Sequence, residues 1–108
     1  MFSAAHAFQN KGQTKIVPVE DVTAYLGKYD LNLPDENGAQ SSTITEIFIH
    51  PDWDFNDIKY DADIALAVLT RKINFTDYIQ PICLPNQSNE FFNNLGFVVG
   101  WGKSEYSE

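Results

Sequence analysis

Residues 61–69 read DADIALAVL, in which two aspartates flank an alanine and a continuous apolar run then extends from Ile64 to Leu69. A run of this length fits a buried β-strand, although periodicity alone also allows a short buried helix. The surrounding sequence favours the strand, because other short apolar segments are separated by residues typical of turns. We therefore expect a strand over 64–69 that is buried on both faces.

Three other segments have the character of strands. Val22–Leu26 and Ser42–His50 are rich in β-branched or aromatic residues, and Leu95–Trp101 is apolar and closed by glycines. Pro51 has no N–H to donate to a sheet ladder, so it should end the second of these strands. Helix signals are weak throughout. The pattern predicts an all-β domain, either a sandwich or a barrel.

Polar segments separate the predicted strands. Gln9–Gln13 and Asn32–Gly38 contain turn residues, and Asp52–Tyr60 is a long polar and aromatic connection. Asn86–Asn94 is rich in Asn, Gln and Ser and reads as a linker.

Composition excludes several classes of function. The chain has 108 residues, enough for one small domain, and its apolar content of 44% supports a core. Its net charge of −8 repels a phosphate backbone, so we expect no nucleic-acid partner. No apolar run approaches the ~20 residues that cross a membrane. One cysteine and two distant histidines cannot close a structural zinc site, and we expect neither a metal nor a cofactor.

Three segments carry chemically useful residues. Ser3–His6 places a histidine after small residues, Asp61–Leu66 places an aspartate at the start of an apolar strand, and Gly96–Gly102 ends in Gly-Trp-Gly. Each alone is weak, because a single histidine is more often a hydrogen-bonded core residue and a single aspartate a turn residue. Their order and flanking residues make the three together more informative.

Five motifs occur in the order typical of the trypsin/chymotrypsin family of serine endopeptidases, which the chain resembles over nearly its whole length. They are AAH at 4–6, HPDW at 50–53, DIAL at 63–66, QPICLP at 80–85 and GWG at 100–102. The resemblance implies a chymotrypsin-like double β-barrel. Residues 1–85 would form an incomplete first barrel, and residues 86–108 a linker and the first strand of the second barrel.

The resemblance also implies roles for particular residues. His6 would be the general base that takes a proton from a serine, and Asp63 would fix the imidazole tautomer and stabilise the imidazolium. The small residues Ala4 and Ala5 would let backbone amides reach the Asp63 carboxylate, which is costly to bury without donors. Tyr60 matches a position that walls a substrate subsite, or is a rim aromatic with no role. His50 is interpreted as structural.

The chain also departs from the family pattern. The nucleophile motif Gly-Asp-Ser-Gly-Gly is absent, so the chain alone should be inactive, with the peptide or protein substrate cleaved by a longer parent. Two alternatives remain: a non-catalytic homologue that acts as a binding or regulatory module, and a truncated product that acts as an interaction module. The sequence lacks a signal peptide, and we expect its true start to have been lost from a secreted protein.

Cysteine usage fits the same resemblance. Cys83 alone would be a buried apolar residue, but in a secreted protein an odd cysteine suggests a partner in another chain. The resemblance implies a disulfide from Cys83 to an N-terminal light chain or regulatory domain. Ala7 and Gly96 stand where family members carry disulfide cysteines, and Ala7 indicates engineering, or drift after loss of the partner.

Two surface features complete the expectations. Gly27–Asp30 resembles the start of the family's calcium loop, but Lys28 places a positive charge where a ligand should be, so we expect no tight calcium site. Asn74-Phe75-Thr76 and Asn86-Gln87-Ser88 match the N-glycosylation pattern, which makes Asn74 and Asn86 candidate acceptors on surface loops.

Overall fold

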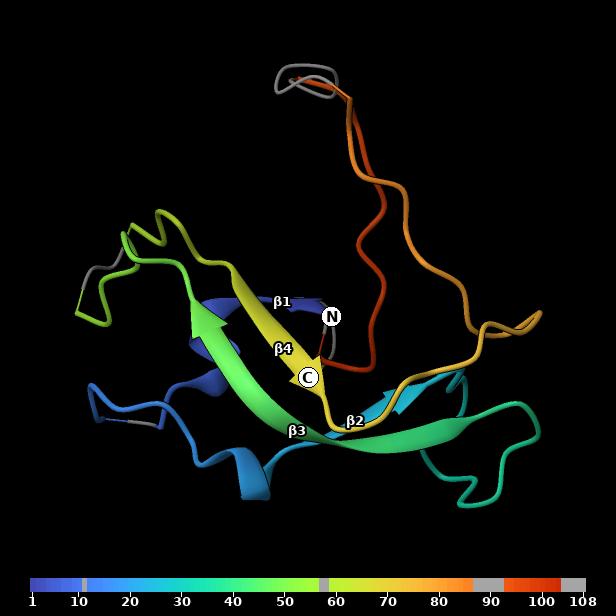
Figure 1. Ribbon diagram of the computed structural model, residues 1–108. Coiled ribbons are helices and arrows are strands. Elements are labelled where there is room, and N and C mark those ends of the chain that lie inside the picture. Colours follow the sequence, from blue (N-terminus) through green and yellow to red (C-terminus); the bar gives the residue numbers. More distant parts are fainter. Residues whose placement is uncertain (11, 57–58, 87–92, 104–108) are drawn as a thin grey trace.

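One antiparallel sheet organises the chain in the computed structural model, which describes residues 1–10, 12–56, 59–86 and 93–103 (Figure 1). Its strands are β1 (Phe2–Ser3), β2 (Thr23–Leu26), β3 (Gln40–Ile49) and β4 (Ala65–Leu69). Two 3₁₀ turns, η1 (Ala5–Phe8) and η2 (Val19–Asp21), are the only helical elements among the described residues. The predicted all-β class is confirmed.

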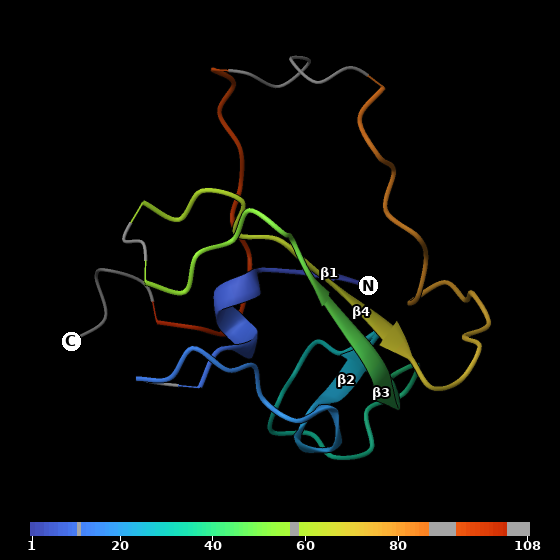
Figure 2. The same cartoon turned by 60° about the vertical axis from the view of Figure 1, so that its left-hand side comes forward.

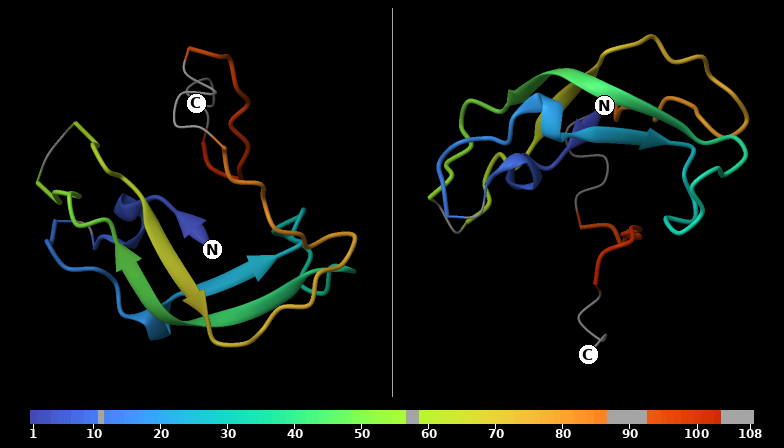
Figure 3. Two further views of the ribbon diagram at one scale, coloured as in Figure 1. Left: turned by 45° about the horizontal axis from the view of Figure 1, so that its top comes forward. Right: turned by 90° about the horizontal axis from the view of Figure 1, so that it is seen from below.

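The long strand β3 gives the sheet its curl. The strand order is β1-β4-β3-β2, and residues 40–43 of β3 pair with β2 while residues from Ile44 onward pair with β4. An irregularity between Ile44 and Glu46 lies near the start of the pairing with β4. Such bulges bend a strand and increase its twist, and Figure 3 shows the sheet curled as part of a barrel wall. This shape agrees with an incomplete chymotrypsin-like barrel.

Three of the predicted strands are present with small shifts at their ends. The segment predicted over 42–50 forms β3, which ends one residue before His50-Pro51, as the lack of a proline N–H requires. The segments predicted over 22–26 and 64–69 form β2 and β4. The short strand β1 was not predicted, because its two residues show no alternation to recognise.

The prediction that residues 64–69 are buried on both faces is wrong. Ala65 and Ala67 are 2% exposed, whereas Leu66 and Val68 on the opposite face are 43% and 41% exposed. The small side chains face the core because the curled sheet leaves little room on its inner side. The larger side chains face outward, where the described part of the chain places no second layer.

The core is small and lies on the inner side of the sheet. It joins η1 to the sheet through a cluster of buried apolar residues, with partly buried side chains such as Val19, Leu26 and Phe55 packed around it. Its buried members are Ala5, Phe8, Ala24, Ile44, Trp53, Ala65 and Ala67. Three of the four contributing sheet residues are alanines, so the backbone of η1 approaches the sheet closely.

The predicted strand over Leu95–Trp101 is not formed. This segment lies beside no strand in the described ranges (Figure 2). Leu95, Phe97 and Val98 are fully exposed. A strand needs a partner for its backbone hydrogen bonds, and the described residues offer none here. A linker and a second-barrel strand within 86–108 remain predictions, and residues 87–92 lie outside the described residues. Among the described residues, no helix has the length and apolarity to cross a membrane.

Candidate active site

The pairing of β1 with β4 brings the N-terminal histidine motif next to the aspartate motif. Ser3 lies opposite Ala65, and continuing this antiparallel register by two residues on each strand puts Ala5 opposite Asp63. The chain then turns into η1, whose second residue is His6. Ala5 is completely buried, and a larger side chain at this point would hold η1 away from the strand end.

His6 and Asp63 form a two-point contact. The Nδ1 atom of His6 lies 2.6 Å from Oδ2 of Asp63, and the backbone N–H of His6 donates to Oδ1 over 2.9 Å. Both carboxylate oxygens are therefore hydrogen-bonded by one residue, which fixes the plane of the carboxylate relative to the imidazole. The contact expected from the sequence, including the approach of backbone amides to Asp63, is present.

The environment keeps Asp63 ionised. Desolvation by partial burial acts to raise its pKa, but hydrogen bonds from the His6 backbone and imidazole, the charge of His6 and the Ala5 amide outweigh it and lower the pKa below the ordinary 3.8. An ionised acceptor at Oδ2 favours the tautomer in which His6 carries its proton on Nδ1. The Nε2 atom then keeps its lone pair, on a side chain that is 55% exposed. No described residue is hydrogen-bonded to Nε2.

The backbone before Asp63 is strained. Tyr60 and Ala62 have positive φ angles of 57° and 58°, a region that side chains with a Cβ rarely occupy. The Ile64 N–H donates to the Ala62 carbonyl over 2.7 Å, which closes a three-residue turn around Asp63. This tight turn aims the Asp63 side chain at η1 rather than along the strand.

A row of aromatic rings begins at the imidazole. The ring of Tyr60 meets His6 edge-on, with centroids 5.8 Å apart and planes at 85°. Behind it, Trp53 lies 6.1 Å from Tyr60, and Phe55 lies 6.2 Å from Trp53. Sequence reasoning singled out Tyr60 but missed Trp53 and Phe55, whose signal was the aromatic content of the 52–60 connection.

The second histidine lies outside this arrangement. The Nδ1 atom of His50 accepts the backbone N–H of Asp52 over 3.1 Å, and the His50 carbonyl accepts the backbone N–H of Trp53 over 3.0 Å. Both bonds close the turn after β3. The structure gives it no contact with His6 or Asp63, in agreement with a structural role.

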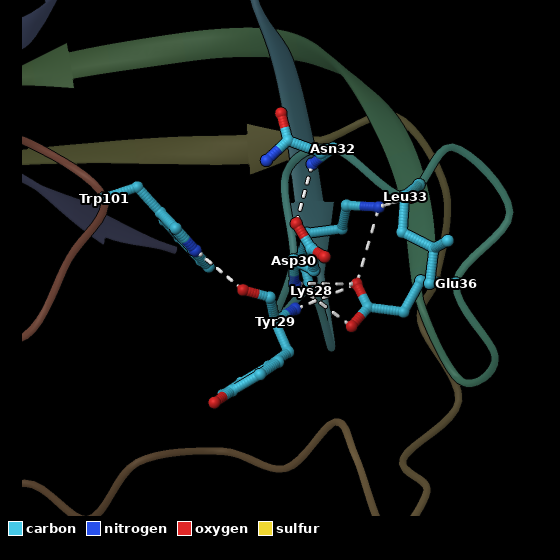
Figure 4. Close-up of polar contacts among 7 residues, drawn as sticks. All are labelled: Lys28, Tyr29, Asp30, Asn32, Leu33, Glu36 and Trp101. Carbon is cyan, nitrogen blue, oxygen red and sulfur yellow. Dashed lines mark hydrogen bonds and ion pairs between the residues drawn. The ribbon is translucent and has the colours of Figure 1, made fainter.

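The loop after β2 is held by an internal ion pair (Figure 4). The Lys28 ammonium lies 3.4 Å from the Glu36 carboxylate and donates to the Leu33 carbonyl. Glu36 also accepts the backbone N–H groups of Tyr29 and Asp30, and these bonds lower its pKa from 4.5. The Lys28 side chain is 6% exposed, so its charge occupies the interior of the loop. Sequence reasoning missed Glu36, although an acid eight residues after Lys28 within one turn was a usable signal.

The remaining predicted residues lie on the surface. Cys83 is an exposed free thiol, which excludes the buried apolar interpretation of this residue. Asn74 and Asn86 are both exposed, as acceptors of a glycan must be. Gln87 and Ser88, which complete the second acceptor pattern, lie outside the described residues. The described residues contain no group of three potential metal ligands.

The His6–Asp63 pair has the arrangement of a general base. A histidine hydrogen-bonded to a carboxylate, with an imidazole side chain that is 55% exposed, could accept a proton from a nucleophile. It lacks a nucleophile within the described residues.

Comparison with known proteins gives the family. The model of the trypsin family matches residues 1–108. The chain is 33% identical over 106 residues to serine protease gd of Drosophila melanogaster. It is 35% identical over 106 residues to the suppressor of tumorigenicity 14 protein homolog of Bos taurus. The chain belongs to the trypsin family.

The relatives are much longer than this chain. The two alignments cover 94% and 97% of the chain, but only 19% and 12% of the respective relatives. A third relative, the inactive CLIP domain-containing serine protease A28 of Anopheles gambiae, is 36% identical over 84 residues, which are 77% of the chain and 22% of that protein. The family therefore includes members named as proteases and members named as inactive.

Proposed function

We propose that the chain supplies the histidine and aspartate of a secreted trypsin-like serine endopeptidase, whose nucleophilic serine lies outside these 108 residues. The observation that carries the proposal is the 2.6 Å contact between His6 Nδ1 and Asp63 Oδ2, on an imidazole whose Nε2 is hydrogen-bonded to no described residue. A pair kept only for packing has no need of an ionised carboxylate, an oriented imidazole and a half-exposed histidine side chain in one place.

The chemistry follows from the protonation states. Nε2 of His6 takes the proton of the serine hydroxyl as that oxygen attacks the scissile carbonyl, and it later returns the proton to the leaving amine. Asp63 stays ionised, because its pKa is lowered, and it stabilises the imidazolium formed between the two steps. The peptide would bind beside the exposed ring of Tyr60, which borders the open side of His6.

Labelling of the full-length protein with a fluorophosphonate tests this function, because the reagent reacts only with an activated serine. Labelling should occur in the wild type and fall by about 10⁴-fold in rate in Asp63→Asn, with at least as large a loss in His6→Ala. His50→Ala is the matched control and should retain labelling. A wild-type protein that folds, binds peptides and is not labelled would overturn the proposal.

A non-catalytic homologue is the second candidate. The relatives named as inactive, A28 and A8 of Anopheles gambiae at 36% identity each, favour it. In such a protein the His6–Asp63 pair would persist as part of the barrel rim. The residue at the nucleophile position of the full-length sequence separates the two candidates directly.

The chain alone is proposed to be inactive. Without a serine nucleophile or the amides that stabilise the oxyanion, the His6–Asp63 pair has no reaction to assist. The purified 108-residue chain should therefore leave chromogenic peptides uncleaved. Hydrolysis that is lost in His6→Ala would contradict this expectation, and the same variant excludes a contaminating protease.

Secretion would allow the exposed cysteine and the two exposed asparagines to be modified. In an oxidising compartment Cys83 could form a disulfide with an N-terminal light chain or regulatory domain, and Asn74 and Asn86 could carry glycans. Expression in secreting cells, followed by non-reducing electrophoresis and glycosidase treatment, tests both. Cys83→Ser should abolish the slow-migrating covalent species, whereas a monomeric wild type would contradict the interchain disulfide.

A further inference from the structure

We infer that Trp53 is a positioning residue that holds the His6 imidazole in place through the ring of Tyr60. This inference rests on the proposed function, since it concerns the geometry of the same base. Trp53 makes no ring contact with His6 itself, and its effect passes through the two successive ring contacts described above.

The two sides of the imidazole are supported unequally. Asp63 fixes one edge of the ring through Nδ1, but the His6 side chain as a whole is 55% exposed. The edge-on contact with Tyr60, at 5.8 Å, is the one aromatic contact that His6 makes among the described residues. Tyr60 therefore limits rotation of the imidazole about its side-chain torsions, which the single hydrogen bond to Asp63 cannot do alone.

Tyr60 needs support of its own. It is 59% exposed and its backbone has a φ of 57°, so neither burial nor backbone preference keeps it where it is. Strained conformations persist only where surrounding contacts over-determine them. Among the described residues, the ring contact that Tyr60 makes with the core is with Trp53, which is 8% exposed and belongs to the core cluster. Trp53 thus connects the rigid core to the exposed ring that borders His6.

The Trp53 indole serves packing rather than hydrogen bonding. Its Nε1 atom is buried with no hydrogen-bond partner among the described residues. An unpaired buried donor is unfavourable. We therefore attribute the role of Trp53 to the packing of its ring and not to its indole N–H. Trp53→Phe should consequently keep the positioning effect, whereas Trp53→Leu should lose it.

The test is ¹⁵N-histidine NMR of the 108-residue chain, which measures the fraction of His6 in the Nδ1–H tautomer and the Tyr60–His6 cross-relaxation. Trp53→Leu should lower the Nδ1–H fraction and reduce the cross-relaxation several-fold, and Trp53→Phe should restore both. Phe55→Leu is the matched control, because the Phe55 ring packs on Trp53 but makes no ring contact with Tyr60. It should leave both signals as in the wild type.

A second variant keeps the test valid if Trp53→Leu does not fold. Tyr60→Ala removes an exposed ring, so the variant should fold and show the same change in the His6 signals. Tyr25→Ala is the control, because Tyr25 has a matching exposure of 60%, and it should leave the His6 signals unchanged. Wild-type His6 signals in Tyr60→Ala would overturn the inference. The two proposals can fail separately. Absence of fluorophosphonate labelling in the full-length protein would count against the proposed function only, because the NMR signals of His6 do not depend on the nucleophilic serine.

Discussion

Asp63 shows how a single residue couples the site to stability. Its carboxylate accepts two hydrogen bonds from His6, and these bonds exist only when the chain is folded. Desolvation opposes them, yet the pKa of Asp63 is lower in the folded state than the ordinary 3.8. The folded protein therefore holds this carboxyl group deprotonated more firmly than the unfolded chain does.

Stability should fall on acidification for this reason. The contribution of Asp63 is complete above its unfolded pKa of 3.8 and is lost as the pH falls through the lower folded value. Urea unfolding at a series of pH values should show a decline below the ordinary carboxyl range. Asp63→Asn should flatten that decline; a profile parallel to the wild type would contradict the assignment.

The left-handed residues before Asp63 allow a test of strain. Ala62→Gly should increase the free energy of unfolding by up to about 1 kcal/mol, because glycine adopts a positive φ without the steric cost of a Cβ. Ala39→Gly is the matched control. Ala39 has no positive φ, so this variant should lower the free energy of unfolding by about 0.5–1 kcal/mol. The free energies are measured by urea unfolding. An equal loss of stability in both variants would show that Ala62 is unstrained.

Much of the candidate site could be predicted at the scale of residues. His6 and Asp63 were identifiable because five motifs occur in the order typical of the trypsin/chymotrypsin family, although each local signal alone is weak. The backbone strain at Tyr60 and Ala62 was not predictable, since neither residue is typical of positive φ. The Trp53–Tyr60 contact was also missed, because six residues separate the two in the sequence and no local pattern there fixes the relative placement of the two rings.

At the scale of elements, the loop over residues 28–36 holds the positive charge of a lysine side chain in its interior. The Lys28 ammonium lies inside the loop and contacts Glu36 and the Leu33 carbonyl, which are oxygen donors of the kind that bind calcium. The Lys28 ammonium thus holds the loop closed through these two contacts. We therefore continue to expect that this loop does not bind calcium tightly.

Calcium dependence should therefore appear only when Lys28 is replaced. The melting temperature of the wild type should be the same in EDTA and in millimolar calcium. Lys28→Glu removes the ammonium and adds a carboxylate facing Glu36, so it should melt lower in EDTA and recover several degrees with calcium. Lys103→Glu gives the same change of charge elsewhere. A calcium response in the wild type would overturn the prediction.

Strand order and register explain which parts of the fold the sequence predicted. Turn residues and β-branched runs located β2, β3 and β4 within one or two residues. The burial of β4 was mispredicted because an apolar run does not reveal which face will be covered. Leu95–Trp101 pairs with no described strand for a related reason: pairing is a property of two segments, and local sequence describes one, so a second-barrel strand there remains a prediction.

At the scale of the whole molecule, the sheet presents apolar side chains outward. Phe48, Leu66 and Val68 are 54%, 43% and 41% exposed on the outer face. Beside β1, an open groove of about 570 Å³ is lined mainly by apolar residues, among them Phe2 and Leu69. Exposed apolar surface of this kind, next to unpaired strand edges, promotes association.

The two faces of β4 should respond differently to substitution. Leu66→Ser should change the free energy of unfolding by less than about 1 kcal/mol while reducing self-association in sedimentation velocity. Ala67→Leu, on the inner face, should cost about 1–3 kcal/mol because the closely packed core cannot expand. Comparable losses of stability in both variants would mean that the outer face is covered in solution.

The two tryptophans sit in opposite surroundings, which has an optical consequence. Trp53 is 8% exposed, while Trp101 is 60% exposed and donates its indole N–H to the Tyr29 carbonyl over 2.8 Å. Fluorescence emission should therefore be a sum of a short-wavelength and a long-wavelength band, and acrylamide should quench the second selectively. Spectroscopy without any added dye can then distinguish detachment of the chain end from melting of the interior.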